Sequence, residues 1–126
     1  MSKPHFPRKK ILVVDDEPSV YETVKMLLEF DGHEVVTADN ADDALTLFDQ
    51  GRFDLVITDY TMPGMKGDEL ALAVKARLPG LPVIMITAHA EIFKSNPTLL
   101  AGVDRLVSKP FHLADLRDAI QKAVTR

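Results

Sequence analysis

Short runs of consecutive apolar residues alternate along this chain with longer segments of helical periodicity. A strand that is covered by helices on both faces is apolar throughout, whereas a strand with one solvated face alternates between apolar and polar residues. The runs predict five strands, at residues 11–14, 34–38, 53–58, 82–87 and 105–108. The intervening segments carry apolar residues three and four positions apart, as amphipathic helices do. This alternation predicts an α/β fold, a doubly wound (βα)5 domain with a five-stranded parallel sheet.

Proline and glycine mark where several of the predicted helices begin and end. Pro18 suits the first position of a helix, because the N–H that it lacks has no helical partner there. Gly32 suits the left-handed residue that often follows a helix. Helices are therefore expected between these two residues, and at about 42–50, 68–78 and 113–124.

The segment between the fourth and fifth strands departs from the helical pattern at Pro97. A proline inside a helix removes a hydrogen bond and clashes with the preceding turn, at a cost of roughly 3 kcal/mol. Asn96 as the N-cap and Pro97 as the first helical residue avoid that cost. We therefore predict a shortened fourth helix at about residues 97–101, preceded by an irregular stretch at residues 91–95.

The composition limits the classes of protein to which the chain can belong. Its 126 residues, 46% of them hydrophobic, suffice for one domain with its own core. The absence of cysteine excludes disulfides and zinc–thiolate sites. No apolar run approaches the roughly 20 residues of a membrane span, and the start lacks a secretory signal, which predicts a cytoplasmic location.

Net charge bears on the choice of partner. A value of −4 argues against direct nucleic-acid binding through bulk electrostatics. The basic residues 8–10 are interpreted as a solvated flank of the first strand. Residues 1–9 are accordingly predicted to be an N-terminal tail, and residues 10–126 the domain.

The carboxyl ends of the predicted strands carry side chains that can do chemistry. In a doubly wound sheet, ligands bind outside these ends. The side chains there are Asp15, Asp16, Asp59, Thr87 and Lys109. Carboxylates held together repel one another, and a hard divalent cation such as Mg²⁺ neutralises them. The metal and the amine could offset the charge of a phosphoryl group, the hydroxyl could donate to it, and one carboxylate could serve as its nucleophilic acceptor.

Each of these residues also has an ordinary structural explanation. The acidic pair at the first strand end could interact with the positive end of a helix dipole. Asp59 could be a turn residue, Thr87 an ordinary β-branched strand residue, and Lys109 a solvated lysine beside a turn proline. Their convergence at one edge of a predicted sheet favours a functional site.

Four segments of the chain resemble the receiver domains of bacterial response regulators, in particular chemotaxis regulators. The segments are ILVVDDEP at 11–18, DLVITDYTMPGMKG at 54–67, VIMITA at 83–88 and SKPF at 108–111. The resemblance spans about residues 10–124. It implies a flavodoxin-like sheet of strand order 2-1-3-4-5.

The resemblance implies a phosphoacceptor and its metal ligands. Asp59 corresponds to the aspartate that accepts the phosphoryl group from a sensor histidine kinase or a histidine phosphotransfer protein. Asp16 resembles the carboxylate that binds Mg²⁺ directly, and Asp15 the one that acts through water. The backbone carbonyl of Thr61 would be a further ligand, and Mn²⁺ a substitute metal.

The remaining implied roles concern the phosphoryl group and the response to it. Thr87 resembles the switch hydroxyl, with Ala88 beside it, and Lys109 the phosphoryl-binding amine. The Lys109–Pro110 bond is similar to one that is cis in the family. Leu106 stands where the family usually has a switch aromatic, so we expect a smaller rearrangement, with residues 91–95 as the moving part.

The four histidines lack the spacing of metal ligands. His5, His33 and His112 are interpreted as exposed residues of the terminus, a turn and a helix start. His89 lies two residues after Thr87. It is either an exposed loop residue or, together with Thr61, a residue that tunes the access of hydrolytic water to the phosphorylated site.

Other functions were weighed against the signalling role. Phosphatases of the haloacid dehalogenase type place two aspartates two positions apart after the first strand, whereas Asp15 and Asp16 are adjacent. The chain is therefore not expected to be an enzyme. A degenerate receiver that binds proteins without accepting phosphate is the alternative.

The expected output is protein contact, through the face formed by the fourth helix, fifth strand and fifth helix. We expect a monomer or weak dimer that binds neither membrane nor nucleic acid. A complete single-domain regulator and a receiver from a longer protein are both compatible with the sequence.

Overall fold

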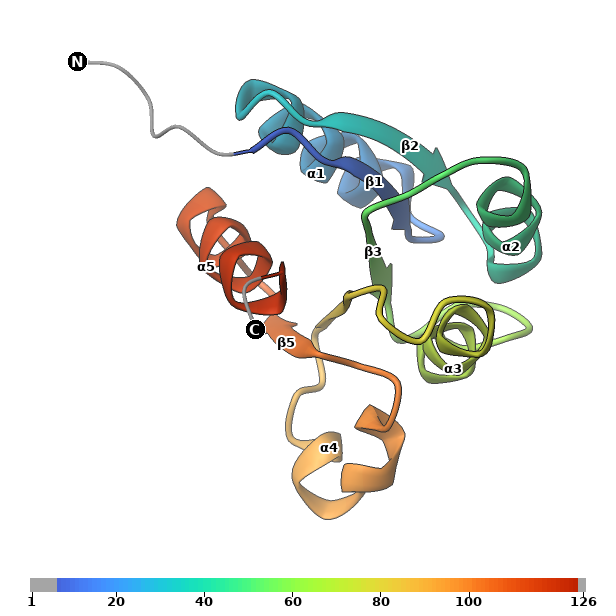
Figure 1. Ribbon diagram of the computed structural model, residues 1–126. Helices are drawn as coiled ribbons and strands as arrows, with labels where there is room; N and C mark the ends of the chain where they lie inside the picture. Colours follow the sequence, from blue (N-terminus) through green and yellow to red (C-terminus); the bar gives the residue numbers. More distant parts are fainter. Residues whose placement is uncertain (1–6, 125–126) are drawn as a thin grey trace.

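Five parallel strands form a single sheet in the order β2-β1-β3-β4-β5 in the computed structural model, which describes residues 7–124 (Figure 1). The strands are β1 (Lys10–Val14), β2 (Glu34–Ala38), β3 (Leu55–Asp59), β4 (Val83–Thr87) and β5 (Arg105–Ser108). The order and the parallel direction are those predicted. His5 and the first six residues of the predicted tail lie outside the described residues.

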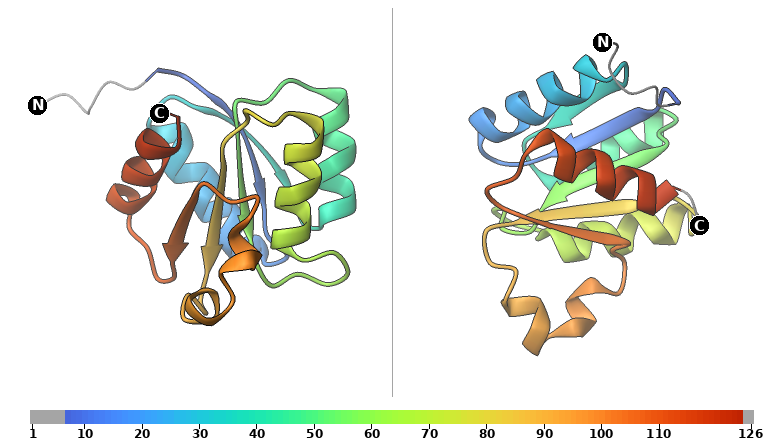
Figure 2. Two further views of the ribbon diagram at one scale, coloured as in Figure 1. Left: turned by 60° about the horizontal axis from the view of Figure 1, so that its bottom comes forward. Right: turned by 90° about the vertical axis from the view of Figure 1, so that its left-hand side faces the viewer.

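Helices cover both faces of this sheet (Figure 2). They are α1 (Pro18–Phe30), α2 (Ala41–Gln50), α3 (Gly67–Arg77), α4 (Ile92–Ser95), the 3₁₀ helix η1 (Pro97–Leu100) and α5 (Leu113–Val124). Helices α1 and α5 lie on one face, and α2 and α3 lie on the other. No helix within residues 7–124 has both the length and the apolar character of a membrane span.

Alternate residues of the central strands supply two hydrophobic cores. Ile11 and Val13 of β1 pack in the cluster that includes residues of α1 and α5. Leu12 and Val14 pack in the cluster that includes residues of α2 and α3. Because successive side chains of a strand point to opposite faces, a strand between two helical layers must be apolar at every position. The continuous apolar runs of the sequence have this cause.

Most element boundaries lie within two residues of those predicted, which is the usual uncertainty at an element end. Pro18 is the first residue of α1, and Gly32, with φ of +91°, takes the left-handed conformation after it. The third strand begins at Leu55 rather than at residue 53 and includes Asp59 as its last residue. The phosphoacceptor candidate is therefore held by the sheet itself.

The connection between β4 and β5 is the part of the fold that the sequence predicted least well. The prediction of an irregular stretch at 91–95 was wrong, because Ile92–Ser95 forms a single turn of α-helix. Pro97 starts a helix as predicted, but this is a 3₁₀ helix that ends at Leu100. The side chain of Asn96 does not cap it, since its Nδ2 donates backwards to the Ile92 carbonyl at 3.1 Å. The fourth helix is shortened, as predicted, but is divided into two single turns.

His33 is buried, which corrects the prediction that it is an exposed turn residue. The residue is 6% exposed, and its Nδ1 accepts a hydrogen bond from the backbone N–H of Lys9 at 3.1 Å. Burial lowers the pKa of this imidazole, although the nearby Asp31 carboxylate opposes the effect. The neutral ring is the form that can accept from Lys9, so the buried position is satisfied without a charge.

Candidate functional site

Three neighbouring strands bring polar side chains together at their carboxyl ends. Asp15 follows β1, Asp59 ends β3 and Thr87 ends β4, and β3 pairs with both β1 and β4. These three residues are 2%, 6% and 1% exposed, respectively. Buried polar groups of this kind are found where a specific partner or ligand compensates their loss of water.

Lys109 supplies a positive charge to the two carboxylates. Its backbone N–H donates to the Thr87 carbonyl at 2.8 Å, which fixes the residue beside the end of β4. From there its Nζ lies 3.2 Å from Asp59 Oδ1 and 3.4 Å from Asp15 Oδ2. The structure therefore joins Asp15, Asp59 and Lys109 in one half-buried ionic cluster.

The pKa values of the cluster show that one ammonium does not fully compensate the two carboxylates. Burial is the main cause that raises the pKa of Asp15, against the Glu17 backbone N–H and Lys109. Burial also raises the pKa of Asp59, and the Asp15 carboxylate raises it further. Burial alone would lower the pKa of Lys109, but the two carboxylates outweigh it and the pKa is raised. The carboxylates of Asp15 and Asp59 would therefore stabilise a further positive charge bound beside them.

This imbalance predicts that Asp59→Asn stabilises the metal-free protein. Folding raises the pKa of the Asp59 carboxyl group above its ordinary value of 3.8. The free energy of unfolding therefore falls as the pH rises from 3.8 through the pKa of the folded protein, and the full loss is present at neutral pH. We expect Asp59→Asn to raise the free energy of unfolding at neutral pH by about 1 kcal/mol. The gain should disappear as the pH falls toward 3.8.

Urea unfolding at several pH values, in a chelator, checks this prediction. Asp42→Asn is the matched control, because Asp42 is an exposed carboxylate in the first turn of α2 and should change stability by less than about 0.5 kcal/mol. A loss of stability in Asp59→Asn at neutral pH would show that the carboxylate is fully compensated in the folded protein.

A group of carboxylates beside the cluster has the chemistry of a divalent-metal site. Oxygen atoms of Asp15, Asp16 and Glu17 lie within 4.8 Å of one another. Oxygen donors of this kind suit Mg²⁺. Asp16 and Glu17 are exposed, and the Glu17 backbone N–H holds Asp15 Oδ1 at 2.9 Å. Glu17 was not among the predicted ligands, although the run of three acidic residues was a visible signal.

The other residues singled out in the sequence surround these clusters on exposed loops. Thr61, Ala88 and His89 are exposed. Thr87 Oγ1 accepts the His89 backbone N–H at 3.0 Å, an arrangement that leaves its own proton free to donate. No hydrogen bond among the described residues joins His89 to Thr61.

The last two features predicted from the sequence are the Lys109–Pro110 peptide bond and Leu106 on the fifth strand. The Lys109–Pro110 peptide bond is cis. Leu106, at the position expected for a switch aromatic, is half-buried on the edge strand β5. Its side chain is aliphatic, so the aromatic ring that the resemblance implies is absent at this position.

A glycine allows the loop after β3 to close against the site. The Gly67 backbone N–H donates to the Tyr60 carbonyl at 2.9 Å. A Cβ at Gly67 would overlap the Asp59 carbonyl oxygen and lie 2.9 Å from Tyr60 Cα. Only glycine fits this close approach of α3 to the end of β3, and it fixes the backbone on the C-terminal side of Asp59.

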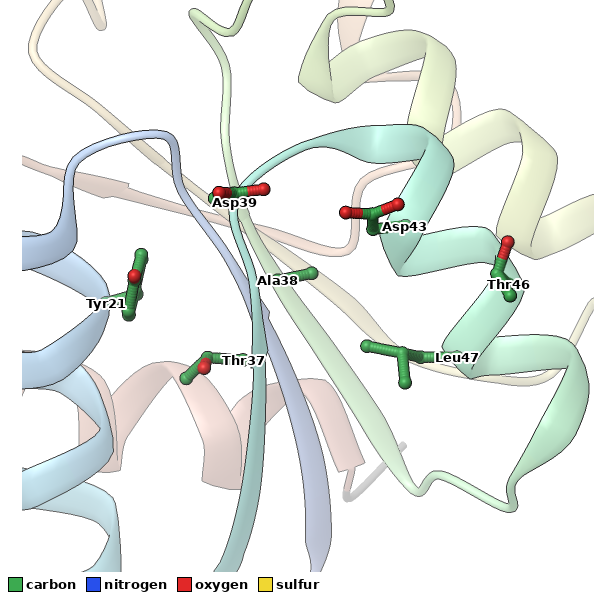
Figure 3. A pocket seen from close by; sticks show the side chains of 7 residues that line it. All are labelled: Tyr21, Thr37, Ala38, Asp39, Asp43, Thr46 and Leu47. Carbon is green, nitrogen blue, oxygen red and sulfur yellow. The ribbon is translucent and has the colours of Figure 1, made fainter.

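A separate hollow of about 410 Å³ lies between α1, β2 and α2 (Figure 3). It is lined by Tyr21, Thr37, Ala38, Asp39, Asp43, Thr46 and Leu47. Its two carboxylates both accept from the side-chain amide of Asn40, at 2.7 and 2.9 Å. No member of the ionic cluster lines this hollow, so the chemistry lies elsewhere.

Comparisons with known proteins agree with the class that this fold and ionic cluster define. The family model described as the response regulator receiver domain matches residues 11–121. The chain is 40% identical over 120 residues to the chemotaxis protein CheY of Pseudomonas aeruginosa, covering 93% of this chain and 97% of that protein. This chain belongs to the response regulator receiver domain family, whose members are signalling domains of two-component systems.

Two further comparisons place the chain within the range of known receivers. The crystal structure of the response regulator TrrA from Thermotoga maritima, in complex with Mg(2+)-BeF, has a TM-score of 0.84 at 36% identity, covering 91% of this chain and 98% of that one. The response regulator protein FleR of Pseudomonas aeruginosa is 34% identical over 113 residues, which are 90% of this chain and 24% of FleR. Similar domains therefore occur both alone and within longer proteins.

Proposed function

We propose that Asp59 accepts a phosphoryl group from a sensor histidine kinase or a histidine phosphotransfer protein, in a Mg²⁺-dependent reaction that changes a protein-interaction surface. The observation that carries this proposal is the position of Lys109 Nζ, within 3.4 Å of both buried carboxylates at the strand ends. Residues 10–126 constitute the receiver domain and residues 1–9 a tail. The domain acts as a monomer or a weak dimer.

The transfer requires an ionised nucleophile and groups that neutralise the incoming oxygens. A carboxylate oxygen of Asp59 attacks phosphorus, the P–N bond to the donor histidine breaks, and the imidazole keeps the bonding electrons. Lys109 contributes its ammonium, Thr87 its hydroxyl proton and Ala88 its backbone N–H. Bound Mg²⁺ would supply further positive charge facing the same oxygens.

Three groups are candidates to hold the metal with Asp59. Asp16 would bind it directly, Asp15 would act less directly, and Thr61 would offer its backbone carbonyl; Mn²⁺ could take the place of Mg²⁺. The group of carboxylate oxygens around Asp15 and Asp16 supports this assignment. The exposed side chains of Thr61 and His89 are the candidates for tuning hydrolysis of the acyl phosphate.

The proposed output surface comprises α4, β5 and α5. Beside the edge strand β5, a hollow of about 470 Å³ is lined by consecutive residues of β5 and by one side of α5. Leu106 contributes to it, so a change at the fifth strand would alter the shape offered to a downstream protein.

Intact-mass measurement after incubation with acetyl phosphate tests the proposed reaction. We expect one phosphoryl adduct that forms with Mg²⁺, is absent with a chelator, and is reduced at least ~100-fold in Asp59→Asn, since the substitution removes the proposed nucleophilic carboxylate. Asp42→Asn, which alters an exposed carboxylate on α2, should be phosphorylated like the original protein.

The alternative function is a degenerate receiver that binds partners without phosphate. That reading would be supported if no adduct forms and beryllofluoride, a mimic of the phosphoryl group, fails to bind in the presence of Mg²⁺. An equal amount of adduct in Asp59→Asn would instead show that another residue is the phosphoacceptor.

A further inference from the structure

The residue after the phosphoacceptor packs directly against the shortened fourth helix. The Tyr60 and Phe93 rings have centroids 5.1 Å apart and planes at 85°, an edge-to-face contact. This geometry is favourable because the positive edge of one ring meets the negative face of the other. Tyr60 directly follows β3 and Phe93 belongs to α4, so the contact joins the site to the proposed output surface.

Phe93 is the anchor of the whole segment that carries α4 and η1. Within residues 91–101, all of which the structure describes, it is the only buried residue, at 3% exposure. Neither hydrophobic core cluster of the described residues includes it. The position of residues 91–101 therefore depends strongly on the side chains that pack against the Phe93 ring. Tyr60 is its aromatic partner.

The backbone of Tyr60 is fixed, which leaves its side chain as the part that can move. Its N–H donates to the Ile86 carbonyl at 3.3 Å, and its carbonyl accepts from Gly67 at 2.9 Å. The Lys66 ammonium lies 5.9 Å from the ring centroid. A phosphoryl group brings a charge of about −1.5 to −2, here one residue away, and so alters the electrostatic environment of the ring and of Lys66.

The usual aromatic partner of a switch is missing from the fifth strand, where Leu106 stands. We propose that Tyr60 and Phe93 couple phosphorylation of Asp59 to the position of residues 91–101. The two rings act as positioning residues and do not take part in phosphoryl transfer. This inference rests on the proposed function, because it concerns the response to phosphorylation at the same site.

Amide NMR spectra with and without beryllofluoride and Mg²⁺ test the coupling. In the original protein, amides near the phosphoryl group, such as those of Ala88 and Lys109, and amides of residues 92–100 should both shift. In Tyr60→Leu the first set should still shift, whereas the shifts of residues 92–100 should fall by more than half. Tyr60→Phe keeps the ring and should restore them.

Two further variants make the result decisive. Phe93→Leu keeps an apolar side chain but removes the ring, so the shifts of residues 92–100 should fall as they do in Tyr60→Leu. This variant keeps the proposal testable if Tyr60→Leu misfolds. Tyr21→Leu alters the only other tyrosine, on α1. In this variant the amides of residues 92–100 should shift as they do in the original protein. Undiminished shifts at residues 92–100 in both Tyr60→Leu and Phe93→Leu would overturn the coupling. Absence of any shift at Ala88 and Lys109 in the original protein would overturn the proposed function itself, and the coupling with it.

Discussion

Replacing Lys109 by methionine is expected to lower the free energy of unfolding of the metal-free protein by about 3 kcal/mol. Methionine keeps an unbranched apolar side chain but removes the ammonium between Asp15 and Asp59. Both carboxylates are buried, and each lies within 3.4 Å of Lys109 Nζ. Without it they repel each other with little solvent to screen them. Urea unfolding at neutral pH in a chelator measures the loss.

Two controls separate this effect from a general loss of charge. Lys122→Met on α5 removes an exposed partner of Asp118, and such a surface pair should contribute less than about 1 kcal/mol. Adding Asp59→Asn to Lys109→Met should restore part of the lost stability, because one of the two repelling charges is then absent. Equal losses in Lys109→Met and Lys122→Met would contradict the role of Lys109 in compensating the buried carboxylates.

Asp16→Asn is expected to weaken Mg²⁺ binding by at least tenfold. Substitutions outside the ligand set already cost about 10–100-fold at metal sites, and the loss of the proposed direct ligand should cost no less. Asp16 belongs to the group of carboxylates whose oxygens lie within 4.8 Å of one another. Calorimetric titration of the unphosphorylated protein with Mg²⁺ measures the affinity.

Glu17→Gln is the informative comparison, because Glu17 belongs to the same group of carboxylates. Its backbone N–H, which the substitution keeps, is the part that holds Asp15. We therefore expect a much smaller loss of affinity than in Asp16→Asn. A larger loss in Glu17→Gln would reassign the direct ligand from Asp16 to Glu17.

The architecture could be predicted from the sequence because local and global signals agree. A sheet between two helical layers requires apolar strands, and Leu12 and Val13 show the requirement in adjacent residues that face different cores. Pro18 and Gly32 mark the ends of α1 through conformations that few other residues favour. These are short-range effects that a single sequence displays directly.

The fourth helix was less predictable because its stability is not local. A single turn such as Ile92–Ser95 is too short to be stable through backbone propensity. Its position relies on burial of Phe93 and on the contact with Tyr60, a residue of the loop that follows β3. Periodicity does not reveal such a contact, whereas the interruption at Pro97 was visible.

The candidate site was predictable in its members but not in its contacts. The rule that ligands bind at strand ends selects Asp15, Asp59 and Lys109, and the structure places these three in one cluster. The ion pair between buried Asp31 and half-buried Arg117, with distances of 2.7 and 2.8 Å across 86 positions, left no comparable sequence signal. The burial of His33 was missed for the same reason, since its partner Lys9 lies just before β1, 24 positions away in the sequence.

The central claim, that Asp59 is the phosphoacceptor, is tested most directly by trapping the acyl phosphate. Borohydride reduces an aspartyl phosphate to homoserine, which remains at the modified position. After incubation with acetyl phosphate and Mg²⁺, reduction and peptide sequencing by mass spectrometry should find homoserine at position 59, and none in the chelator control. Homoserine at Asp15 or Asp16, or at no position, would contradict the assignment.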